Sequence, residues 1–133
     1  MTSLITPEQA VSIDEYIAER SLKMSAEQMR RLARHLKAFE RKAEQAAAEH
    51  RFELLRGIHL MVDVLSSREL AVQRGPLPAG LAELAVAADY LLKGFDLIPD
   101  SLAQIGLSDD EWIVTRVMQR NPGLAQTTWT PLA

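Results

Sequence analysis

Apolar side chains recur at alternating spacings of three and four residues from Met29 to Leu65, and no proline interrupts them. This spacing places successive side chains on one face of an α-helix. The pattern therefore predicts one long helix or two collinear helices over this range. Residues 27–53 carry charges on their other faces, as in an antiparallel hairpin arm or a coiled coil. Residues 54–65 are apolar on most sides, which predicts a position at the centre of a bundle.

The composition favours the same fold class. The 133 residues are 47% hydrophobic but 5% aromatic, so the core has to be built from aliphatic side chains, which favour helices. A chain of this length can fold as one domain without disulfides or metals. The lack of cysteine excludes disulfides, thiolate zinc sites and cysteine nucleophiles. We therefore expect an all-α protein, a small bundle of four to five helices with the long helix or collinear pair at its centre.

Capping residues and breaks divide the single domain expected over residues 1–133. Thr6 and Gln9 predict the start of a first helix that ends near residue 20. Ser25 and Gln28 form a second capping box, at the start of the long helix. The later segments expected are a break at 73–78, helices at 79–93, 99–105 and 109–120, and a tail at 121–133.

Aspartates, glycines and a proline are concentrated between the last long helices. Tyr90 is followed by Asp96-Leu-Ile-Pro-Asp100, and Gly106 precedes the pair Asp109-Asp110. In these residues the segment 76–120 resembles the YkvA-like family, also called domain of unknown function 1232.

This resemblance is to a divergent member, because Lys93-Gly94 and Ala103 stand where the family usually has prolines. It covers about a third of the chain and leaves the N-terminal helices of residues 1–75 outside it. The resemblance implies a helical fold, and it implies no particular reaction because the family has no established activity.

The four aspartates are candidate metal ligands. Asp96, Asp100, Asp109 and Asp110 lie close together in sequence, and carboxylate oxygens are the ligands that Mg²⁺ and Ca²⁺ prefer. A structural role explains most of them equally well, because acidic residues cap helices and are favoured in the first helical turn. Asp96 would then accept a backbone N–H in an Asx-turn. We favour the structural interpretation and keep a divalent-cation or small-ligand site as the alternative.

A basic stripe follows the expected long helix. Arg30, Arg34, Lys37 and Arg41 recur on one face, where they could contact anionic lipid, RNA or an acidic partner. Glutamates are interspersed on this helix, so we favour a solvated face over these binding roles. The net charge of −3 gives no general attraction to nucleic acid.

Trp129 in the tail has two interpretations. It either packs back on the bundle or serves as a short peptide ligand for a partner, and the sequence leaves both open.

The sequence lacks recognisable catalytic motifs. It contains no phosphate-binding glycine loop, nucleophile elbow or metal-spaced histidine pair, so we expect a non-catalytic protein. It has no signal peptide and no run of roughly twenty apolar residues, so we expect a cytoplasmic protein without a transmembrane span.

The apolar stripe is longer than the remaining helices are expected to cover. This favours a module that binds a protein partner or a second copy of itself. The alternatives are a cation or small-ligand domain built on the four aspartates, and peripheral membrane contact through the basic helix.

Overall fold

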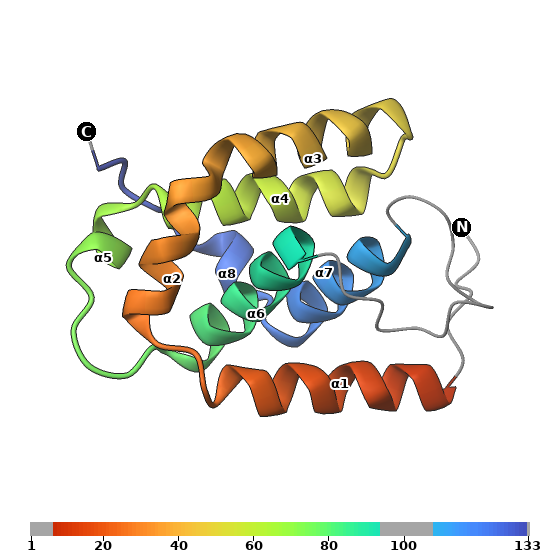
Figure 1. Ribbon diagram of the computed structural model, residues 1–133, viewed down its shortest axis with the longest axis horizontal. Helices are drawn as coiled ribbons and strands as arrows, with labels where there is room; N and C mark the ends of the chain where they lie inside the picture. The colour runs from red at the N-terminus through yellow and green to blue at the C-terminus, as the bar shows by residue number, and fades with distance from the viewer. Residues whose placement is uncertain (1–6, 94–107, 133) are drawn as a thin grey trace.

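The computed structural model describes residues 7–93 and 108–132, and these form a bundle of helices (Figure 1). In chain order the elements are α1 (Pro7–Ser21), α2 (Ala26–Leu32), the 3-10 turn η1 (Ala33–His35), α3 (Leu36–Ala48), α4 (Phe52–Leu65), α5 (Arg68–Ala71), α6 (Ala79–Lys93), α7 (Ser108–Arg120) and α8 (Gly123–Gln126). The strand-like pairing found within these ranges is an isolated antiparallel bridge, Ser67–Pro131. The predicted all-α class is confirmed.

Local signals in the sequence located several elements correctly. At the start of α2, the Gln28 N–H donates to Ser25 Oγ (3.1 Å), and the Ser25 N–H donates to Gln28 Oε1 (2.9 Å). Both bonds of the predicted capping box are therefore present. The helices α1, α6 and α7 match their predicted ranges, whereas α5 and α8 were not predicted. The short helix predicted at 99–105 lies outside the described residues.

The long helix predicted over residues 29–65 is wrong, and so is the collinear pair. The chain bends at η1 and reverses direction at residues 49–51. As a result α3 and α4 lie side by side as an antiparallel hairpin (Figure 1).

The reversal at the end of α3 is a Schellman motif with His50 in the left-handed conformation, at φ 57°. The His50 N–H donates to the Ala47 carbonyl (3.1 Å), and the Arg51 N–H donates to the Ala46 carbonyl (2.8 Å). These bonds satisfy carbonyls that the helix end leaves open. Glycine is usual here because the left-handed conformation costs other residues roughly 1 kcal/mol. With no glycine or proline to mark it, the turn was missed.

The hairpin allows the apolar stripe to cover itself. Most of its members are buried, on α2 and on both arms of the hairpin: Met29, Leu32, Phe39, Leu54, Ile58, Met61 and Leu65. The two arms pack against each other, and α4 also packs against α7 and α6. The bundle therefore covers most of the stripe, and the members that stay exposed are Ala47 and His50, near the hairpin reversal.

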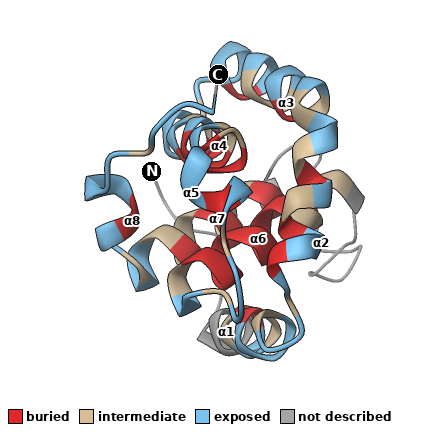
Figure 2. Ribbon diagram, turned by 90° about the vertical axis from the view of Figure 1, so that its left-hand side faces the viewer, coloured by how far each residue is buried: buried red, intermediate tan, exposed pale blue. Residues whose placement is uncertain are grey.

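The helix at the centre of the bundle is α6, not the predicted segment 54–65. It contacts α1, α2, α3, α4 and α7, and every residue from Leu81 to Ala88 is buried. Figure 2 shows this buried segment enclosed by the other helices. Against α7, a Cβ at Gly57 of α4 would collide with the Val114 side chain, so glycine permits this close approach.

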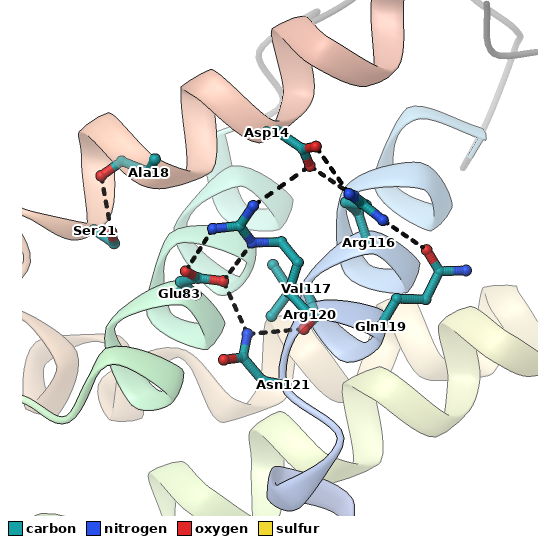
Figure 3. Close-up of polar contacts among 9 residues, drawn as sticks. All are labelled: Asp14, Ala18, Ser21, Glu83, Arg116, Val117, Gln119, Arg120 and Asn121. Carbon is teal, nitrogen blue, oxygen red and sulfur yellow. Dashed lines mark hydrogen bonds and ion pairs between the residues drawn. The ribbon is translucent and has the colours of Figure 1, made fainter. Parts of the chain in front are cut away.

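A network of charges connects α1 to α6 and α7 (Figure 3). Arg116 donates to both carboxylate oxygens of Asp14, at 2.6 and 2.9 Å. Arg120 donates to both oxygens of Glu83, at 2.9 and 3.0 Å, and Asn121 adds a bond of 2.8 Å. Paired bonds of this kind fix orientation as well as charge. The network therefore holds α1 in a defined position against the bundle.

No helix in residues 7–93 and 108–132 is long and apolar enough to cross a bilayer.

Candidate functional site

Asp109 and Asp110, two of the predicted metal ligands, begin α7 and are buried. Lys42 Nζ of α3 lies 2.8 Å from Asp110 Oδ2, and the Tyr90 hydroxyl donates to Asp109 Oδ2 at 3.5 Å. Burial raises the pKa of Asp110, and the hydrogen bond and charge of Lys42 oppose that rise. Asp96 and Asp100 lie outside the described residues, so the four-aspartate site stays a prediction.

The start of α7 has a clear structural role. Glu111 binds Arg51 at 3.0 Å, so ion pairs from Lys42 and Arg51 join this turn to α3 and to the hairpin reversal. Within the described ranges, no group of three histidine, aspartate or glutamate side chains is arranged to hold a metal. The described part of the acidic segment therefore attaches α7 to the hairpin.

The predicted basic stripe divides into two kinds of residue. Arg30 Nη1 donates to the carbonyls of Leu70 (3.2 Å) and Gln73 (3.0 Å), which connects α2 to the end of α5. Arg34, Lys37 and Arg41 are exposed, and none of them forms an ion pair with another residue that the structure describes. The sequence pattern could not separate Arg30 from the others because its partners are distant backbone carbonyls.

Trp129 packs back against the core and is half-buried. The tail around it runs beside the α4–α5 junction: the Arg68 N–H donates to the Thr130 carbonyl (2.8 Å), and the Leu132 N–H donates to the Ser66 carbonyl (3.1 Å). The structure therefore agrees with the first interpretation of Trp129, in which this side chain packs back on the bundle.

A groove of about 590 Å³ opens between α1, the α2–η1 segment and α6. Its volume is typical of ligand-binding clefts, which range from about 300 to 1,000 Å³. Apolar side chains from three segments form its floor: Met24, Leu32, Val86 and Leu92. Leu32 and Val86 are buried, and the other two are half-buried. The groove is therefore a recess with an apolar base.

Basic side chains line the same groove: Arg20, Lys23, Arg31 and His35. Neither Lys23 nor His35 forms an ion pair with another residue in the described part of the chain. The acidic residue of the lining is Asp89, on α6. The groove is thus locally basic, although the whole chain carries a net charge of −3.

The two arginines of the groove, Arg20 and Arg31, have weak contacts. Arg31 pairs with Glu27 at 2.7 Å, but the two side chains are 60% and 70% exposed. Such a surface pair contributes less than about 1 kcal/mol. Arg20 lies over the ring of Tyr16, 5.3 Å from its centroid. Both guanidinium groups can therefore turn toward an incoming carboxylate at little cost.

Tyr16 contributes a hydroxyl to the groove. Burial raises its pKa; the Arg20 charge opposes the rise and the Asp89 charge reinforces it. The phenol is therefore protonated at neutral pH and available as a hydrogen-bond donor. Its ring also packs edge-on against Tyr90 with centroids 6.0 Å apart, which fixes its position.

Leu22 lies between Arg20 and Lys23 in sequence and is 87% exposed, but it is not among the residues that line the groove. A single exposed leucine is normal on a protein surface. Sequence reasoning missed this site because its lining comes from three helices whose packing no local pattern reveals. The available signal was Asp89 within the apolar pattern of α6.

Comparison with known proteins gives no match: no protein-family model, curated protein or solved structure is sufficiently similar to this chain. Its function is therefore inferred from the groove.

Proposed function

We propose that this chain is a non-catalytic, cytoplasmic protein–protein interaction module, and that the groove between α1, α2 and α6 is its binding site. The observation that supports this is a recess with an apolar base and basic side chains in its lining. Interfaces commonly combine an apolar centre that partner side chains fill with a polar rim that selects the partner. This observation replaces the uncovered stripe as the reason to expect a partner.

The contacts that hold α1 against the bundle also fix the shape of the groove, which favours binding without large rearrangement. The ion pairs of Asp14 and Glu83 with α7 hold α1 in place, and Tyr16 packs against Tyr90 of α6. Association loses less entropy when the binding surface is ordered beforehand. A pre-formed groove is therefore suited to recognition of a partner segment.

Site-specific crosslinking tests this proposal. A photoreactive p-benzoylphenylalanine replaces Leu22, an exposed residue that precedes the lining residue Lys23, and a matched variant carries it in place of Phe52, an exposed apolar residue at the hairpin turn. In living cells of the native host, we expect a discrete crosslinked protein from the Leu22 position and not from the Phe52 position. The charge reversals Lys23→Glu and Arg31→Glu should remove that product. Equal products from both positions, or none from either, would contradict the proposal.

We also propose that residues 76–120 are related to the YkvA-like family. The support is the order of Tyr90, Asp96-Leu-Ile-Pro-Asp100 and Asp109-Asp110 in the sequence. Homologues gathered from genome sequences would test it. If Asp96 and Asp100 vary freely among them, the relationship fails.

A further inference from the structure

We infer that the groove binds an acidic amphipathic helix of a partner protein, with apolar side chains entering the recess and carboxylates meeting the cations. This inference rests on the proposed interaction function and adds the chemistry of the partner.

The shape of the groove fits a short stretch of helix. On one side its residues Gln28, Leu32 and His35 follow a spacing of three and four, and on the other Val86, Asp89 and Leu92 follow each other at a spacing of three along α6. At about 1.5 Å per residue, each side is roughly 10 Å long, which is about two helical turns. Partner side chains at positions i, i+3 or i+4, and i+7 span the same length.

The floor suits aliphatic or aromatic anchors. Leu32 and Val86 are buried beneath the opening, and half-buried Met24 has a flexible side chain that adapts to different shapes. An anchor that enters the groove therefore loses contact with water on several sides.

The charges select an acidic partner. Lys23 forms no ion pair with the residues described, and the pair of Arg31 with Glu27 is exposed. Carboxylates on the partner's flanks would gain these cations, whereas lysine or arginine there would be repelled.

A recessed floor fits a helix better than a membrane. Membrane-surface helices present projecting apolar side chains, often aromatic, between their cations. Here Leu32 and Val86 are buried within the groove, and the aromatic ring that lines it, Tyr16, is half-buried against Tyr90. Side chains delivered by a protruding helix can reach this floor.

Designed peptides of about 15 residues, long enough to form a helix on binding, provide the test. The first has leucines at a three-four spacing and glutamates on its flanks. The second has the same composition in a scrambled order, and the third has lysines in place of the glutamates. Titration into the full chain, followed by fluorescence anisotropy of a dye on the peptide, should give an affinity at least about tenfold higher for the first peptide.

Matched charge reversals locate the binding site. Lys23→Glu with Arg31→Glu should weaken the first peptide by at least about tenfold. Arg34→Glu with Lys37→Glu makes the same change of charge on exposed residues outside the groove lining, and should leave affinity within about twofold. Equal loss in both double variants would indicate general electrostatics and overturn the inference. Anionic vesicles that bind the chain and compete fully with the peptide would also overturn it.

The two proposals fail in different ways. If the crosslink at Leu22 captures a partner whose attached segment is neither helical nor acidic, and the first peptide does not bind, this inference is wrong and the interaction function stands. If no specific crosslink forms at Leu22, the interaction function itself is wrong.

Discussion

The network that holds α1 and the groove beside it use basic residues in opposite ways. In the network, Arg116 and Arg120 donate to carboxylates of other helices through paired hydrogen bonds (Figure 3). Lys23 and His35, in the groove, have no ion pair with the residues described. Both regions lie along α1 and α6. This difference shows that the number of cations on a surface does not by itself reveal their role. A cation that pairs with a carboxylate of another helix supports the fold, whereas one without such a pair is available to a partner.

The central helix contributes an acid to each region. Glu83 of α6 is 8% exposed and receives the Arg120 guanidinium, whose hydrogen bonds hold the pKa of this carboxyl below its usual range. Asp89, nearly two turns further along α6, is half-buried in the groove wall. The part of α6 around Glu83 therefore stabilises the fold, whereas the part around Asp89 borders the groove.

The largest effect expected on stability comes from breaking the paired region. Arg120→Ala leaves the carboxylate of Glu83 buried with Asn121 as its remaining hydrogen-bond donor of those described. We expect the free energy of unfolding to fall by about 2 to 4 kcal/mol, measured by urea denaturation. Arg120→Lys keeps the charge but loses the paired geometry, so its loss should be smaller. A loss below about 0.5 kcal/mol for the alanine variant would show that the network does not support the fold.

Acid should weaken the paired region in a predictable direction. The Arg116 hydrogen bonds lower the pKa of Asp14, and the Arg120 hydrogen bonds lower that of Glu83. Their stabilisation is complete above the ordinary values of 3.8 and 4.5, and is lost as pH falls through the lowered values. Between pH 6 and pH 3, Arg120→Ala should lose about 1 kcal/mol less stability than the unaltered chain.

Asp110 provides an internal control for this pH dependence. Its pKa is raised by burial, so its ionisation opposes folding as pH rises through 3.8 toward the raised value. In the unaltered chain, protonation of Asp110 therefore adds stability as pH falls. Asp110→Asn removes this gain, so the free energy of unfolding should fall more steeply in acid than it does in the unaltered chain. Parallel pH profiles for the three proteins would refute the assignment of acid sensitivity to these groups.

The smallest effect on stability is expected in the groove. Lys23→Glu with Arg31→Glu should change the free energy of unfolding by no more than about 0.5 kcal/mol, since the broken pair with Glu27 is exposed. The same variant should lose affinity for the acidic peptide. Loss of stability comparable to that of Arg120→Ala would show that the groove cations belong to the fold.

Local sequence signals correctly predicted those features of the fold that depend on interactions between nearby residues. The capping box at Ser25 and the ranges of α1, α6 and α7 followed from residues a few positions apart. The hairpin reversal did not, because His50 takes the position where glycine usually marks a helix end. An unbroken apolar pattern cannot distinguish a long helix from one that folds back and packs against itself.

The candidate site could not be predicted from the sequence, because it depends on contacts between residues that are far apart in the chain. Asp109 and Asp110 were correctly placed at a helix start, but the pairing of Asp110 with Lys42 joins residues of different helices. Arg30 was grouped with solvated cations because its backbone acceptors lie on α5 and beyond. The groove itself exists where three separate segments meet.

The hairpin also has a consequence for the order of folding. The turn at residues 49–51 brings α3 and α4 together with little loss of chain entropy, whereas joining Asp14 to Arg116 closes a loop of 102 residues. We expect the hairpin to form early and α1 to dock late, which pulse-labelled hydrogen exchange would resolve. Because α1 supplies one wall of the groove, a partly folded chain would hold most of its core and still lack the binding site. Recognition of a partner would then report that folding is complete.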